Sequence, residues 1–217
     1  QIKSALTDEN TVIMAKTDGG RALLNRLLGL ATAAGDNDAI ERAAKQVHDQ
    51  NMTLSQGALM ALNHCDHSAR VVALQAFHDR WQGSPLVMEK WFMMESMSSV
   101  SGTVARLGEL MAHPAFDANN PNKLRSVLGA FMTGNPVHFY ADDGSGFDFI
   151  GDCLIDIDGR NPQLAARMVL PLTRMAQYAP ERRAKMGAVL QKIQKHAQSN
   201  DLREVIDKAL ADRPSPA

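Results

Sequence analysis

Apolar residues recur at spacings of three and four along almost the whole chain. This spacing places them on one face of an α-helix. Two of the clearest stretches are Leu124, Val127, Leu128 and Phe131, and then Phe147, Ile150, Leu154 and Ile157. A similar spacing in Val71, Leu74, Phe77 and Trp81 predicts another helix. Strict alternation of apolar and polar residues over the length of a strand is hard to find beyond the first fifteen residues. The pattern predicts an all-α fold.

The spacing of the predicted helix starts indicates how the helices are organised. Starts near Ser84, Asn120 and Asn161 are separated by roughly 40 residues, which is typical of two-helix solenoid units. The residues at equivalent positions differ, so the regular spacing reflects the arrangement of the helices and not a repeated sequence. We therefore predict an α-α superhelix of stacked helix pairs, resembling armadillo or HEAT arrays, as a single domain over residues 1–211. The tail at 212–217 contains two prolines and is predicted to be disordered.

Three Asn-Pro pairs open helical stretches, at Asn120-Pro121, Asn135-Pro136 and Asn161-Pro162. An asparagine side chain can accept a hydrogen bond from a free N–H of the first turn, and proline at the first helical position has its φ preset. Arg125 and Arg167 follow two of these starts closely. Cations beside the positive ends of helices could line a site for an anionic group.

Composition excludes several functional classes. Lys plus Arg total 23 against 24 Asp plus Glu in 217 residues, and no basic stripe suggests a nucleic-acid partner. The longest charge-free stretch, residues 126–141, falls short of the ~20 apolar residues that span a bilayer. Two distant cysteines and no signal peptide predict a reduced, cytoplasmic protein. The first residue is Gln1 and not methionine, so we interpret the chain as a piece of a longer protein.

The sequence does not match the catalytic and metal-binding motifs that its histidines and cysteines suggest. None of the seven histidines begins the HExxH motif of a zinc peptidase. The segment His64-Cys65-Asp66-His67 has side chains that suit zinc, but it lacks a second ligand pair. An interhelical turn with Asp66 as N-cap is favoured over a metal site. The alternative, a small metalloenzyme built on His64, Cys65 and His67, would contain stoichiometric zinc.

A long, ordered series of motifs resembles the C-terminal helical domain of bacterial aminopeptidase N, a family of zinc aminopeptidases also called alanyl aminopeptidases. The resemblance is strong from about Asp79 to Ala211 and weaker before that. Its motifs are Leu86–Phe92, Asn120–Phe131, Asn135-Pro136, Asp143–Phe147, Arg160–Gln163, Pro171-Leu172 and Lys208–Ala211.

The resemblance implies that catalysis and closure of the active-site cavity belong to different domains. In this family a thermolysin-like domain holds zinc through HExxH and a distal glutamate, and a GxMEN loop binds the substrate's amino terminus. The present chain has neither motif, since Met88-Glu89 is followed by Lys90. It is therefore expected to lack catalytic residues and bound metal and to be inactive alone. Its expected partners are its own catalytic domain and peptide substrates, in a monomeric enzyme whose active-site cavity this domain closes.

The resemblance also implies three substrate-binding residues. The arginine of NPN-x-x-R falls on Arg125, and the glutamine and arginine of RNPQ-x-x-x-R fall on Gln163 and Arg167. Gln163 and Arg167 are four residues apart and should share one helix face. An arginine near a helix start is otherwise usually solvated or paired locally. The alternative function is a stand-alone helical-repeat scaffold that binds a protein or peptide on its concave surface.

Overall fold

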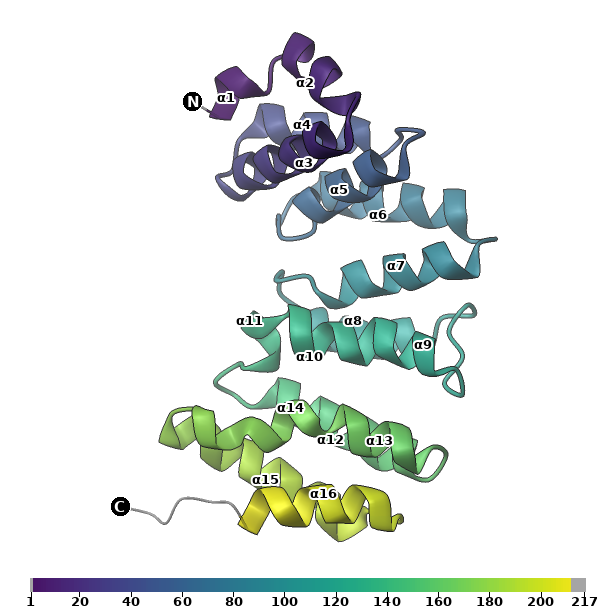
Figure 1. The fold of residues 1–217 in the computed structure, drawn as a ribbon, viewed down its shortest axis with the longest axis vertical. Helices are drawn as coiled ribbons and strands as arrows, with labels where there is room; N and C mark the ends of the chain where they lie inside the picture. The colour runs from purple at the N-terminus through teal and green to yellow at the C-terminus, as the bar shows by residue number, and fades with distance from the viewer. Residues whose placement is uncertain (1, 212–217) are drawn as a thin grey trace. The chain divides into compact units, whose positions relative to one another are not determined.

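The computed structural model describes residues 2–211, and within this range it contains helices and no strand (Figure 1). The predicted all-α helical-repeat fold is confirmed. The helices are α1 (Ile2–Ala5), α2 (Asp8–Ala15), α3 (Asp18–Ala33), α4 (Asn37–Gln46), α5 (Met52–Leu62), α6 (Ser68–Trp81), α7 (Pro85–Ser96), α8 (Thr103–Met111), α9 (Pro121–Leu124), η1 (Arg125–Gly129), α10 (Ala130–Gly134), α11 (Pro136–Phe139), α12 (Ser145–Asp158), α13 (Pro162–Met168), α14 (Leu170–Thr173), η2 (Arg174–Gln177), α15 (Pro180–His196) and α16 (Asn200–Ala211). No helix in the described range is both long and apolar enough to cross a membrane.

Backbone contacts divide the chain into two compact units, with the boundary between Ser101 and Gly102. We call them unit 1 and unit 2 and treat each by itself. The interpretation of residues 1–211 as a single domain stays a prediction. The predicted disordered tail at 212–217 lies outside the described residues.

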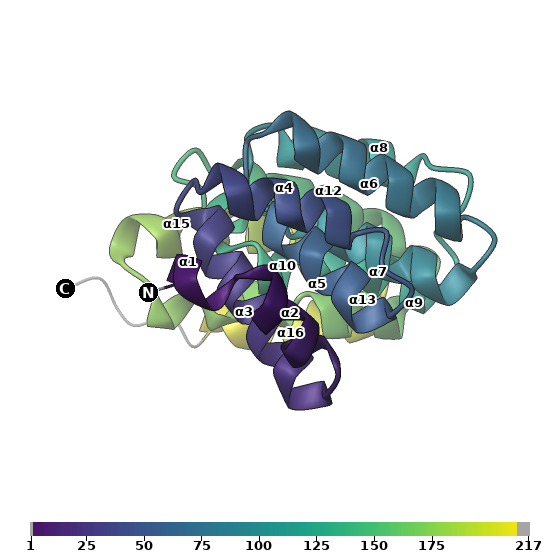
Figure 2. The ribbon, with the colours of Figure 1, turned by 90° about the horizontal axis from the view of Figure 1, so that it is seen from above.

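Unit 1 consists of α1 to α7. Helices α3, α5 and α7 form one layer, and α4 and α6 form the other (Figures 1 and 2). Each helix buries an apolar stripe between the layers, as the 3.6-residue period requires. In α6 the stripe is Ala73, Leu74 and Phe77, whereas Val71 is 63% exposed. The predicted helix is present as α6, with Val71 on its exposed side.

Unit 2 stacks three helix pairs. Helices α8, α12 and α15 form one layer, and the second layer contains the continuous α9–η1–α10 segment, then α13 with α14, then α16 (Figures 1 and 2). The apolar residues that predicted these helices fill the space between the layers. Those of α12, Phe147, Ile150, Leu154 and Ile157, are at most 1% exposed.

Two glycines set the start of α12. Gly144 precedes the helix with φ 81°, a left-handed conformation that glycine adopts without steric cost. Gly146 lies against α11, where an added Cβ would be 2.2 Å from the His138 carbonyl oxygen. The close approach of α12 to α11 therefore requires glycine at position 146, and it fixes the position of Tyr140 just after α11.

Candidate functional site

The three Asn-Pro pairs form the helix starts that the sequence predicts. The Asn120 side chain accepts a hydrogen bond from the Asn122 N–H at 2.9 Å. Asn135 and Asn161 accept from the N–H groups of the residues three positions later, each at 3.1 Å. Proline occupies the first helical position in every case. The prediction of side-chain caps is confirmed.

Gln163 and Arg167 lie together on α13. Both side chains are exposed, while Leu164, Ala165 and Met168 on the other side of the helix are buried. Residues four apart in a helix are neighbours on its surface, so the amide and the guanidinium share one face. Within residues 2–211 neither side chain forms a hydrogen bond or an ion pair. The face therefore carries a full positive charge and a free amide.

Arg125 has a different local environment. It is the first residue of η1, a π-helical segment within the longer α9–η1–α10 helix. The Ala130 N–H bonds to the Arg125 carbonyl oxygen, five residues back, and such π segments are frequent at functional sites. The exposed Arg125 guanidinium donates a hydrogen bond to the Asn122 side-chain oxygen at 3.1 Å. Because Asn122 is neutral, the bond orients the guanidinium without compensating its charge.

The structure brings two of the three predicted residues together. Gln163 and Arg167 share a turn of α13, whereas Arg125 lies on another helix of the same layer of unit 2 (Figure 1). Arg125 makes no contact with the other two among the described interactions. The candidate site thus consists of two separate exposed groups, Arg125 on η1 and Gln163 with Arg167 on α13.

The His64–His67 segment forms an interhelical turn. The His67 ring Nδ1 accepts a hydrogen bond from the Ala69 N–H at 3.1 Å and so caps α6. The prediction that Asp66 is the N-cap is therefore wrong, because His67 holds the extended conformation at that position. The buried Cys65 thiol points to the Thr32 carbonyl oxygen at 3.5 Å, and burial raises its pKa. Among residues 2–211 no group of three or more His, Cys, Asp or Glu side chains is placed to hold a metal ion.

A pair of tyrosines in unit 2 was not anticipated from the sequence. The Tyr178 and Tyr140 hydroxyl groups share a hydrogen bond of 2.6 Å, and the ring centroids are 5.0 Å apart. The Arg182 guanidinium lies over the Tyr140 ring, 5.6 Å from its centroid. Burial, followed by the hydrogen bond with Tyr178, raises the pKa of Tyr140 to about 12. The two tyrosines are 38 residues apart, so no local pattern could have paired them.

The stacked helix pairs and the exposed polar face define the class of protein as a helical-repeat domain of the armadillo type. Residues 1–211 match the family described as "Domain of unknown function (DUF3458_C) ARM repeats". The chain belongs to this family.

Relatives with known names extend the comparison. The chain is 37% identical to aminopeptidase N of Escherichia coli over 193 residues, which are 88% of this chain and 22% of that protein. It is also 37% identical to aminopeptidase N of Haemophilus influenzae over 161 residues, 74% of this chain and 18% of that protein. The chain thus spans about a fifth of the length of the curated relatives it matches.

A solved structure has the same fold. The crystal structure of Legionella pneumophila aminopeptidase A in complex with aspartic acid matches with a TM-score of 0.85 and 29% sequence identity. The match covers 90% of this chain and 23% of that one. The resemblance to the C-terminal helical domain of bacterial aminopeptidase N is confirmed.

Proposed function

We propose that this chain is the C-terminal domain of a cytoplasmic, monomeric, zinc-dependent aminopeptidase that removes N-terminal residues from peptides. The zinc and the catalytic residues belong to a separate catalytic domain, and this chain supplies neither. Its role is to close the active-site cavity, to limit access to peptides, and to bind the part of the substrate downstream of the cleaved bond.

One observation carries the binding role: the unpaired Gln163 and Arg167 side chains on one exposed face of α13. A guanidinium can donate two parallel hydrogen bonds to a carboxylate, and an amide can both donate to and accept from a peptide group. No acidic side chain within residues 2–211 pairs with Arg167. A peptide carbonyl or carboxylate would therefore gain hydrogen bonds without breaking an existing ion pair.

Arg125 contributes in a second way. Its hydrogen bond to the neutral Asn122 keeps the guanidinium in one orientation at the start of η1. A preorganised donor loses less side-chain entropy when a ligand binds. We propose that Arg125 contacts a different part of the peptide from Gln163 and Arg167.

The test compares two substrates of the full-length aminopeptidase that contains this chain. Arg125→Ala and Arg167→Ala should each lower kcat/KM for a peptide, because one charge-assisted hydrogen bond is worth ~1.5–3 kcal/mol, or roughly 10- to 150-fold. A small chromogenic alanyl amide has no downstream residues, so its kcat/KM should change little. Gln163→Ala should act in the same direction with a smaller effect, since its bonds are neutral.

Arg106→Ala is the matched control, because Arg106 lies in the opposite layer of unit 2 and pairs with Glu109 at 2.7 Å. It should affect neither substrate. Equal losses on peptide and amide in the Arg125 and Arg167 variants would exclude the downstream role. Hydrolysis of an alanyl amide by the purified chain alone would exclude the proposal that the catalytic residues belong to a separate domain.

The stand-alone scaffold remains the second candidate, since exposed polar helix faces also suit protein-binding repeats. The two functions differ in what the coding sequence upstream contains. An in-frame HExxH motif is expected for the aminopeptidase, and its absence would favour the scaffold.

A further inference from the structure

A second group of polar side chains in unit 2 lies outside the site described above. We call it the Tyr140 cluster; it consists of Tyr140, Tyr178, Arg174 and Arg182. Tyr140 follows α11, Arg174 and Tyr178 bracket η2, and Arg182 lies in the first turn of α15. Tyr140 and the segment 174–182, which are distant in the sequence, thus supply one hydroxyl pair and two guanidinium groups.

The hydrogen bonding of the tyrosine pair leaves one donor free. The two hydroxyl oxygens are 2.6 Å apart, and one hydroxyl donates to the other. A hydroxyl group carries one proton and can also accept a hydrogen bond, so the hydroxyl that accepts this bond keeps its own proton. This remaining proton of the tyrosine pair favours a ligand with an acceptor oxygen.

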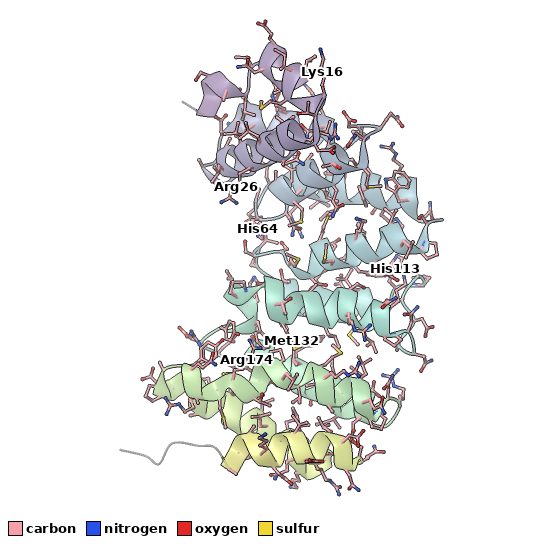
Figure 3. All side chains as sticks on the ribbon, viewed as in Figure 1. Lys16, Arg26, His64, His113, Met132 and Arg174 are labelled. Atoms are coloured by element: carbon pink, nitrogen blue, oxygen red, sulfur yellow. The ribbon has the colours of Figure 1, made fainter. Side chains whose placement is uncertain are left out.

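The charges around this donor are positive. Arg174 and Arg182 both act on Tyr140 electrostatically. Arg174 is exposed, and it forms no ion pair or hydrogen bond with the described part of the chain; it lies on the side of unit 2 that faces the viewer in Figure 3. Arg182 is partly compensated by Asp142, whose Oδ1 is 3.6 Å from its Nη2. The net charge of the cluster therefore comes mainly from Arg174.

A surface hollow beside the cluster is lined by equal numbers of acidic and basic side chains, so it has no excess positive charge to attract an anion. It has a volume of about 310 Å³ and carries Asp142 and Glu181 alongside Arg182 and Lys185. The uncompensated charge is instead that of Arg174. Burial, and next the hydrogen bond with Tyr178, raise the pKa of Tyr140 to about 12, so its hydroxyl keeps its proton throughout the physiological range.

We propose that the Tyr140 cluster binds the carboxylate of a peptide, with the remaining hydroxyl proton of the Tyr140–Tyr178 pair and the Arg174 guanidinium as its two donors. The proposal rests on the proposed function in one respect, namely that peptides reach this domain. A carboxylate accepts one hydrogen bond from the hydroxyl and one or two from the guanidinium, and both bonds are charge-assisted. It also compensates the charge of Arg174, which no acidic side chain in the described range does.

The test measures peptide binding to the 217-residue chain by calorimetry, without any hydrolysis. The probes are hexa-alanine as a free acid, the same peptide with a C-terminal amide, and an amidated peptide that contains one glutamate. The free acid should bind about tenfold more tightly than the amide, the difference expected for a charge-assisted contact. If the amidated glutamate peptide binds as tightly as the free acid, the carboxylate can come from a side chain; if it does not, the terminus is the ligand.

Arg174→Gln, and the double substitution Tyr140→Phe with Tyr178→Phe, should each remove most of the preference for the acid over the amide. Arg106→Gln, which alters an arginine already paired with Glu109, should leave it intact. Equal binding of acid and amide to the unaltered chain would overturn the proposal, as would an unchanged preference in Arg174→Gln. The outcome is independent of the substrate comparison for Arg125 and Arg167, so failure of either proposal can be recognised separately.

Discussion

Arg70 in unit 1 and Arg167 in unit 2 occupy opposite environments. The Arg70 side chain is 12% exposed, and its Nη2 lies 3.4 Å from the Oε2 of Glu95, whose side chain is 5% exposed. The Arg70 Nε also donates to the Asn63 carbonyl oxygen at 3.2 Å. Arg167 is exposed and has no such partner within residues 2–211. One arginine is part of the interior of its unit, and the other faces outward.

The two environments suit different roles, one in the stability of the fold and one in the binding of a ligand. An enclosed charge has lost its water, so its partners in the fold must replace that hydration completely. Removing one partner then leaves an uncompensated charge. An exposed arginine keeps its water and contributes little to stability, and its donors remain available to a ligand. We expect the free energy of unfolding to depend on Arg70 and substrate use to depend on Arg167.

The largest effect is expected for Arg70→Met. It removes the Arg70 cation from beside the buried Glu95 carboxylate, and breaking a buried pair in this way costs about 3–5 kcal/mol. Urea unfolding followed by circular dichroism measures the loss. Replacing both partners, as Arg70→Met with Glu95→Leu, should recover much of it, because no isolated charge remains.

Arg167→Met is the matched control for this comparison. A substitution at an exposed, unpaired position should change the free energy of unfolding by no more than about 0.5 kcal/mol. If Arg167→Met were as destabilising as Arg70→Met, the distinction between enclosed and exposed arginines would fail.

Unit 2 also contains the enclosed charge of Asp158, which extends the comparison. Asp158 at the end of α12 is 1% exposed. Its Oδ2 accepts hydrogen bonds from the N–H groups of Gln198 and Ser199 at 2.6 and 3.0 Å, and the Ser199 hydroxyl donates to its Oδ1. These bonds hold the connection between α15 and α16.

Asp158→Ala removes every one of these acceptors, and we expect a loss of about 2–3 kcal/mol, because hydrogen bonds to a charged group are worth more than neutral ones. Asp158→Asn keeps one oxygen for the two N–H groups and should cost clearly less. Thermal unfolding of the two variants measures the difference. Equal losses would show that the negative charge, and not the acceptor geometry, stabilises this turn.

The helices were largely predictable because their signals are local. Apolar spacing located the buried faces of α12 and α13, and the Asn-Pro pairs located the starts of α9, α11 and α13. The π segment was not predictable, since Leu124, Val127, Leu128 and Phe131 fit a regular α-helix equally well. Val71 shows the limit of spacing alone: an apolar residue at helical spacing can still lie on the exposed side.

The candidate site was predictable only where its residues are neighbours in sequence. The four-residue spacing placed Gln163 and Arg167 on one face, as the structure has them. The bond between Arg125 and Asn122 depends on the rotamers of two side chains, which a sequence pattern does not specify. The pairing of Tyr140 with Tyr178 depends on the packing of α11 against α12 and on the course of η2. Contacts of this kind follow from tertiary structure alone.

The smallest expected effect is the pH dependence that Arg70 imposes on His64. Partial burial of the His64 ring, and next the charge of Arg70, lower the pKa of His64 from its ordinary value of 6.5. At a pH between the two pKa values the unfolded chain binds the proton more readily than the folded one. The contribution of His64 to stability is therefore complete above pH 6.5 and is lost as the pH falls below it.

Urea unfolding at pH 7.5 and at pH 5.5 tests whether the free energy of unfolding falls on acidification. The unaltered chain should lose more stability on acidification than His64→Gln, which cannot titrate. Arg70→Met removes the nearby charge, so the pKa of His64 should rise, as an NMR titration of the imidazole would measure. The ring Nδ1 lies 3.1 Å from the Ser99 Oγ, and Ser99→Ala controls for that contact because it leaves the Arg70 charge in place. If acidification destabilised the unaltered chain and His64→Gln equally, the enclosed charge of Arg70 would have no measurable effect on its neighbour.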